Sequence, residues 1–103
     1  MYRVWLDDVR PPPENGNWDM WVKTGERCIE LLDEDKVGAI SFDHDMGTPV
    51  TGYVVSLHIE RGRYNGKFGY PIYWEIHSMN PVGAKNIRKS MENADRFLKR
   101  WSK

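Results

Sequence analysis

The chain has 103 residues, a formal net charge of zero and one cysteine. Its length suits one domain with one core, and its 40% content of hydrophobic residues excludes a disordered chain. The lone cysteine excludes an internal disulfide and a zinc site built from several thiolates. No stretch approaches the roughly 20 apolar residues of a membrane span, and Met1 leads into a predicted strand without a signal peptide. We therefore expect a cytoplasmic protein with no membrane partner.

The first half of the chain alternates short strands with a loop and a helix. A strand over Tyr2–Leu6 leads into residues 10–17, where three consecutive prolines and an Asn-Gly pair exclude a helix interior. A second short strand is predicted over residues 18–23. A helix follows over residues 24–34, with a threonine as its N-cap. A third strand, residues 37–42, is apolar enough for the centre of a parallel sheet.

The second half repeats this alternation. A helix is predicted over residues 50–61, with Val54 and Leu57 packed inward. Residues 63–70 are rich in turn-forming residues and favour a small hairpin. A fourth strand follows over residues 72–76. Strands that alternate with helices predict an α/β fold with a mainly parallel sheet of about four strands, and we assign the whole chain, 1–103, to that one domain.

The last predicted helix, residues 82–101, is amphipathic and basic. Its apolar residues recur at spacings of four and three, as on one face of a helix: Ile87, Met91, Ala94, Leu98 and Trp101. Residues 83–103 carry seven basic and two acidic side chains, whereas residues 1–50 carry five basic and eleven acidic ones. This distribution suits either a site where acids bind a metal and bases bind an anionic substrate, or a helix with a solvated basic face.

Three of the predicted strands end in acids or histidine. Asp7 and Asp8 follow the first, the sequence Asp-His-Asp at 43–45 follows the third, and His77 follows the fourth. The carboxyl ends of parallel strands lie side by side, which is where open α/β folds bind ligands. We therefore expect these carboxylates and imidazoles to share one crevice.

The carboxylates of this crevice are candidate metal ligands. Asp7, Asp8 and Asp43 would form a shell that suits Mg²⁺ or Mn²⁺ and leaves room for water and phosphate oxygens. Alternatively, the acids only cap loops, or histidine joins them to bind a transition metal such as Zn²⁺. His44 and His77 are also candidates for general acid and base, because imidazole exchanges protons near neutral pH. Asp45 would be a further ligand or would assist these catalytic histidines.

Four more residues are candidates for contacts with phosphate. Ser78 and Asn80 lie between the fourth strand and the long helix, whose N-terminus favours an anion. Asn86 lies in the first turns of that helix. Arg10, two residues beyond the acid pair, is either a bidentate phosphate clamp or a surface arginine of the proline loop.

The acids at these strand ends resemble those of response-regulator receivers. Asp7 and Asp8 resemble the acid pair of the first receiver strand, and Asp43 resembles the phosphoacceptor. Two features depart from that pattern: a proline loop replaces the first helix, and no strand with a lysine follows His77. A standard phosphoacceptor switch at Asp43 is therefore not expected.

A closer resemblance is to the cyclic-phosphate processing receiver domain, a family derived from receivers. It is carried by three motifs in order: Leu6-Asp7-Asp8-x-Arg10-x-Pro12, Ser41-Phe42-Asp43-His44-Asp45-x-Gly47, and Ile76-His77-Ser78-x-Asn80-x-x-Gly83-x-x-Asn86-Ile87. The resemblance implies a small receiver-like (flavodoxin-like) three-layer fold, truncated relative to standard receivers. It also implies a metal-dependent phosphoesterase that acts on cyclic phosphate ends of RNA or nucleotides.

A non-catalytic module is the alternative to an enzyme. It would bind a nucleotide, an RNA end or a protein partner, and its acids would hold a structural cation. Trp18, Trp21 and Tyr64 are candidates for stacking on a base in that case.

Overall fold

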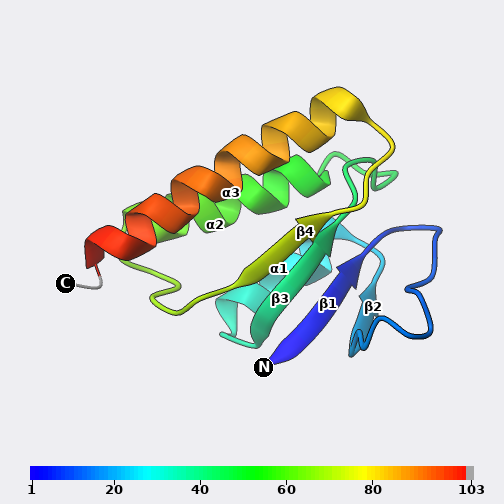
Figure 1. The fold of residues 1–103 in the computed structure, drawn as a ribbon, viewed down its shortest axis with the longest axis horizontal. Coiled ribbons are helices and arrows are strands. Elements are labelled where there is room, and N and C mark those ends of the chain that lie inside the picture. The colour runs from blue at the N-terminus through cyan, green and yellow to red at the C-terminus, as the bar shows by residue number, and fades with distance from the viewer. Residues whose placement is uncertain (102–103) are drawn as a thin grey trace.

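The computed structural model describes residues 1–101 of this α/β chain (Figure 1). Its strands are β1 (Tyr2–Leu6), β2 (Met20–Val22), β3 (Val37–Phe42) and β4 (Tyr73–Ile76), and its helices are α1 (Gly25–Asp33), α2 (Gly52–Tyr64) and α3 (Pro81–Trp101). The strands form one parallel sheet in the order β2-β1-β3-β4. The predicted receiver-like fold with a parallel sheet of four strands is therefore confirmed.

One face of the sheet carries the hydrophobic core. Val4 and Leu6 of β1, with Ile40 and Phe42 of β3, point to this face because alternate residues of a strand lie on the same side. In Figure 1, α1 lies behind the sheet, and α2 and α3 run side by side. All three helices contribute buried residues to this same core: Cys28, Leu31, Leu32, Val55, Ile59, Ile87, Met91 and Ala94.

The opposite face is partly covered by a loop, while Tyr73 and Glu75 of β4 on the same face are exposed. Trp5 of β1 points to this face and is only 4% exposed. Its indole N–H donates to the carbonyl oxygen of Arg10 over 2.8 Å, and its ring contacts Trp18, with the two centroids 5.8 Å apart. The β1–β2 connection is not helical, because its prolines lack the donors that a helix needs. Where a three-layer fold has helices on both faces, this chain therefore has a proline loop on one.

The predicted hairpin over residues 63–70 does not form. Helix α2 continues to Tyr64, and the chain then turns without a strand before β4. Arg63 is completely buried, and its guanidinium donates to two carbonyl oxygens of the following loop and to Asp95 at 2.9 Å. This buried arginine holds the loop against α3. Its burial was not predictable, because arginine is seldom buried unless it is paired.

Helix α2 also buries a different stripe from the one predicted. Val55 and Ile59 are fully buried, whereas Val54 and Leu57 are only half-buried. Apolar residues occur at adjacent positions of this helix, so its sequence fits more than one inward face. The packing against α3 selects between them.

Helix α3 confirms the predicted long amphipathic helix. Ile87, Met91 and Ala94 are buried as expected, but Trp101 is 62% exposed. The indole N–H of Trp101 donates to the carbonyl oxygen of Arg63 over 2.7 Å. Within residues 1–101, no helix is both long enough and apolar enough to cross a membrane.

Candidate functional site

The ends of β1, β3 and β4 bring Asp7, Asp43 and His77 together. Leu6 and Phe42 are register partners, and the ladder continues past them: the backbone N–H of Asp43 donates to Leu6 and that of His77 to Phe42, over 3.0 and 2.9 Å. One ligand atom of each of the three side chains lies within 4.8 Å of the other two. The predicted convergence of strand ends therefore produces a cluster of two carboxylates and one imidazole, which we call the acid–histidine cluster.

Asp7 is the most buried member of the cluster, at 2% exposed. Its Oδ1 accepts hydrogen bonds from the backbone N–H groups of Val9 and Arg10, over 2.9 and 2.7 Å, and its Oδ2 lies 2.9 Å from Nε2 of His77. Burial raises the pKa of Asp7, but the hydrogen bonds from Arg10, Val9 and His77 outweigh it and hold the pKa below its ordinary value. Asp7 is therefore an anion at neutral pH.

Asp43 is in the opposite electrostatic situation. Burial and then the negative charge of Asp7 raise the pKa of Asp43, although its Oδ1 accepts a hydrogen bond from the backbone N–H of His44. In the described part of the chain, no lysine or arginine forms an ion pair with Asp7 or Asp43. Two adjacent carboxylates without a lysine or arginine partner repel each other, and a bound cation would relieve that repulsion.

The imidazole of His77 is held on two sides. Trp5 stacks on it, and Nδ1 lies 2.7 Å from the hydroxyl oxygen of Ser41. That hydroxyl donates in turn to Glu75 over 3.2 Å, so its oxygen is free to accept a hydrogen bond from Nδ1–H. In the metal-free site Nε2–H donates to Oδ2 of Asp7, whereas a bound cation would take the place of that proton while Nδ1–H stays on Ser41. His77 can therefore bind a cation, or exchange a proton, at Nε2.

His44 forms a second histidine–carboxylate pair directly after Asp43. Its Nδ1 lies 3.0 Å from Oδ1 of Asp45 and 3.5 Å from the side-chain nitrogen of Asn80. The ring lies against Gly83 at the start of α3, where a Cβ atom would come within 2.3 Å of it. Because Asp45 occupies Nδ1, Nε2 is the nitrogen that remains for proton exchange with a ligand.

Asp8 and Arg10 lie beside the cluster. The carboxylate of Asp8 is turned toward Gly47, whose Cβ position would be 3.0 Å from Oδ2, and Asp8 is not part of the three-residue group. The side chain of Arg10 is exposed, while its backbone holds Asp7 and Trp5 in place. The predicted roles of Asp8 as a metal ligand and of Arg10 as a phosphate clamp stay predictions.

The connection between β4 and α3 caps the helix. Oδ1 of Asn80 accepts from the backbone N–H of Gly83 over 2.9 Å, and the hydroxyl of Ser78 accepts from the N–H of Asn80 over 3.1 Å. Ser78 and Asn80 therefore reach the site end of α3 as expected, with capping as their observed role. Asn86 lines a hollow between α2 and α3, together with Glu60 and other residues, and its predicted contact with phosphate stays a prediction.

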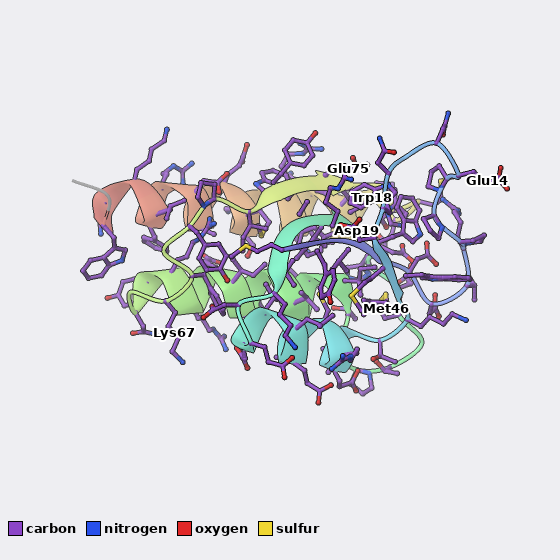
Figure 2. The ribbon with its side chains drawn as sticks, turned by 90° about the horizontal axis from the view of Figure 1, so that it is seen from below. Glu14, Trp18, Asp19, Met46, Lys67 and Glu75 are labelled. Atoms are coloured by element: carbon purple, nitrogen blue, oxygen red, sulfur yellow. The ribbon has the colours of Figure 1, made fainter. Side chains whose placement is uncertain are left out.

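Figure 2 places this end of the molecule. Trp18 and Glu75 lie near each other on the loop side of the sheet and Met46 on its core side, whereas Lys67 lies at the opposite end of the molecule. Helix α2 begins beside the cluster, where Gly52 lies against Asp43, and Tyr64 is its last residue, so Tyr64 lies toward the far end. Of the three aromatic residues considered for base stacking, only Trp18 and Trp21 are therefore close to the cluster.

Several residues of the site were not identified from the sequence as site residues. In the sequence, Trp5 is only one residue of an apolar strand. Its contact with His77 arises because the sheet places β1 and the end of β4 near each other. Ser41 carried a usable signal, since it is the one polar side chain of β3. Gly52 supports the site in a way that no motif indicates: a Cβ atom there would come within 1.8 Å of the carbonyl oxygen of Asp43.

Comparison with known proteins supports the family resemblance. A family model described as the cyclic-phosphate processing receiver domain matches residues 2–93. No curated protein and no solved structure matches the chain. The matched range contains the whole acid–histidine cluster and the His44–Asp45 pair, and it ends before the last two turns of α3.

Proposed function

Because the chain belongs to the cyclic-phosphate processing receiver domain family, we propose that it is a metal-dependent phosphoesterase. Its substrate would be a cyclic phosphate on an RNA end or on a nucleotide. The observation that carries this proposal is the convergence of Asp7, Asp43 and His77, whose ligand atoms lie within 4.8 Å of one another. The exposed Arg10 and the polar cap of α3 lie beside them and would bind the oxygens of the phosphate.

The donor set fits a divalent cation. Asp7 and Asp43 offer the carboxylate oxygens that Mg²⁺ and Mn²⁺ prefer. A Zn²⁺ ion would instead use Nε2 of His77 as a further ligand, and that nitrogen could then not carry a proton. Asp8, the next residue in the chain, is the further predicted ligand. When bound, the cation would offset negative charge on the phosphate and lower the pKa of a coordinated water.

The two histidines would carry the protons of the reaction. Hydrolysis of a cyclic phosphate forms one P–O bond to water and breaks one ester bond, so one proton leaves the water and one reaches the departing oxygen. His44 would exchange its proton at Nε2, because Asp45 lies against its Nδ1. His77 would act at Nε2 as well, because Ser41 lies against its Nδ1.

Turnover assays test this proposal directly. The purified protein is incubated with Mg²⁺, Mn²⁺ or Zn²⁺, and separately with chelator, against 2′,3′-cyclic nucleotides, 3′,5′-cyclic nucleotides and RNA with a cyclic-phosphate end. We expect product by chromatography only when a metal ion is present, and none from Asp43→Ala. Glu30→Ala is the matched control, because it removes an exposed carboxylate from α1. Turnover that persists in chelator or in Asp43→Ala would contradict the metal-dependent mechanism.

A binding module without catalysis is the second candidate, and Trp21 favours it. Its indole N–H donates to the carbonyl oxygen of Asp7 over 2.7 Å, and its ring is 37% exposed with Nζ of Lys23 at 4.2 Å from the centroid. A fixed, partly exposed indole beside the cluster suits stacking on a base. A metal-dependent rise in melting temperature with one ligand, without product, would support this function over the enzyme.

A further inference from the structure

The exposed face of α3 is predominantly positively charged. Six of its exposed charged residues are basic and one is acidic: Lys85, Arg88, Lys89, Glu92, Arg96, Lys99 and Arg100. Because successive residues of an α-helix are rotated by about 100°, these positions lie on one side of α3. Within residues 1–101, none of these six cations forms an ion pair. The other acid of the helix, Asp95, is paired with the buried Arg63 at 2.9 Å, so it does not offset this basic face.

An aromatic groove adjoins the end of this basic face. It is a hollow of about 380 Å³ lined by Tyr64, Phe97, Arg100 and Trp101. Tyr64 and Trp101 are each 62% exposed, and the indole of Trp101 is fixed by its hydrogen bond to the carbonyl oxygen of Arg63. The ring centroid of Phe97 lies 5.4 Å from that of Tyr64 and 5.9 Å from Cζ of the Arg100 guanidinium. Exposed rings beside cations are typical of sites that bind single-stranded nucleic acid.

Helix α3 connects this groove with the candidate active site. Gly83, near its start, lies against His44, and Trp101 is 18 residues further along, about 27 Å at 1.5 Å per residue. A strand of several nucleotides can span that distance with its phosphates along the basic face. Phe97, Arg100 and Trp101 of the groove lie outside the range matched by the family, whereas Tyr64 and the first half of the basic face lie inside it.

We propose that the basic face of α3 and its aromatic groove bind single-stranded RNA that leads to a cyclic-phosphate end at the acid–histidine cluster. The cations would contact backbone phosphates, and Tyr64 and Trp101 would stack on bases. The inference rests on the proposed function and narrows it, since it makes an RNA end the preferred substrate over a free cyclic nucleotide. A 2′,3′-cyclic phosphate requires a 2′-hydroxyl group, which identifies the strand as RNA.

The binding test uses a fluorescent single-stranded RNA of about ten nucleotides with a plain 3′-hydroxyl end, followed by anisotropy. Arg88→Glu/Arg96→Glu should weaken binding by about tenfold or more, because it reverses two cations on the face. Trp101→Ala should weaken it by about tenfold through lost stacking, with Tyr64→Ala as a second groove variant. The matched control reverses two cations elsewhere, Arg27→Glu/Lys36→Glu, and should bind within about twofold of the wild type.

Two outcomes would overturn the inference. Equal affinities of the wild type and the Arg88→Glu/Arg96→Glu protein would remove the basic face from RNA binding. Binding of poly-glutamate as tightly as RNA, with no effect of Trp101→Ala, would indicate an acidic protein partner instead.

A turnover arm separates this inference from the proposed function. The ratio of kcat/KM for cyclic-phosphate-ended RNA to that for the cyclic mononucleotide should exceed one in the wild type and fall in Trp101→Ala. Hydrolysis of the mononucleotide without RNA binding would overturn only the RNA surface. RNA binding without hydrolysis of any cyclic phosphate would overturn the proposed function.

Discussion

The imidazole of His77 stacks on the indole of Trp5, with ring centroids 3.8 Å apart and planes 7° apart. The two residues come from β1 and the end of β4, which are separated in the sheet by β3. The stack lies on the face of the sheet that the proline loop partly covers, opposite the hydrophobic core. Because the indole N–H also donates to Arg10, the ring of Trp5 is fixed, and it fixes the plane in which His77 faces Asp7.

Replacing His77 should affect catalysis far more than folding. In His77→Ala the carboxylate of Asp7 keeps its two backbone hydrogen bonds, so the protein should still fold. We expect kcat to fall by about 100-fold or more, as for the loss of a general acid or base. Thermal unfolding and steady-state kinetics measure the two effects. His58→Ala is the control, because that histidine pairs with Asp33 outside the site; wild-type turnover in His77→Ala would remove His77 from the mechanism.

Ser41 should act as a positioning residue for His77. Ser41→Ala removes the partner of Nδ1 and leaves Glu75 without its donor, so the ring of His77 loses one of the contacts that orient it. Partners of this kind typically change metal affinity or activity by about 10–100-fold. We expect a loss in that range, with an altered pH profile of kcat and a cost of about 1 kcal/mol in unfolding free energy. An unchanged pH profile would reduce Ser41 to a packing role.

The charge of Asp43 should destabilise the metal-free protein. Its pKa is raised in the folded state by burial and by Asp7, so the folded protein binds this proton more tightly than the unfolded chain does. Stability is therefore lost as the pH rises from the ordinary carboxylate range through the folded pKa, and the loss persists at neutral pH. Asp43→Asn should melt a few degrees higher than the wild type in chelator at neutral pH.

The difference in melting temperature should shrink at acidic pH, because protonated Asp43 is uncharged in both the folded and the unfolded protein, as asparagine is. Added Mn²⁺ should raise the melting temperature of the wild type and leave Asp43→Asn unaffected, because a ligand stabilises only the state that binds it. Differential scanning fluorimetry across pH, with and without metal, measures both effects. A lower melting temperature for metal-free Asp43→Asn would contradict the electrostatic account of the cluster.

Gly83 should be intolerant of a side chain. A Cβ atom there would come within 2.3 Å of the ring of His44, so Gly83→Ala must displace either the ring or the start of α3. We expect a cost of about 1–3 kcal/mol and a loss of turnover. Gly69→Ala is the matched control, since nothing lies within 4 Å of its Cβ position. Chemical denaturation and kinetics on both variants measure the two effects. Equal stability and turnover in Gly83→Ala and Gly69→Ala would contradict a close contact between Gly83 and His44.

Arg63 should be a major contributor to stability at the end opposite the site. Arg63→Met would remove the ion pair with Asp95, which keeps its hydrogen bond from Trp74, and would leave two carbonyl oxygens of the loop after α2 without their donor. Because the side chain of Asp95 is 43% exposed, the cost should come mainly from these carbonyl groups, at about 1–3 kcal/mol each, measurable by urea unfolding. Under folding conditions, turnover of a cyclic mononucleotide should persist, because Arg63 lies far from the cluster; a small change in unfolding free energy would contradict the role of the buried arginine.

Local sequence was sufficient for the four strands, the three helices and the location of the candidate site, although it also favoured a hairpin over residues 63–70 that does not form. Tyr2–Leu6 and Val37–Phe42 are strands with the predicted bounds, and Thr24 caps α1 as predicted. Apolar runs followed by acids identify buried strands whose polar ends meet at one edge of a parallel sheet. The contact of Asp7 and Asp43 with His77 follows from that topology.

Contacts between distant segments were decided only by the tertiary structure. The sequence determined the α/β class, the number of strands and the edge of the sheet where acids and histidine meet, because strand periodicity and polar strand ends are local patterns. Tertiary packing decided that Trp5 and Ser41 hold His77, that Arg63 is buried, that α2 turns Val55 inward and that Asn86 faces a hollow beside α2. These outcomes depend on which side chains meet across the sheet and between helices, and residues far apart in the chain carry no local signal of that contact.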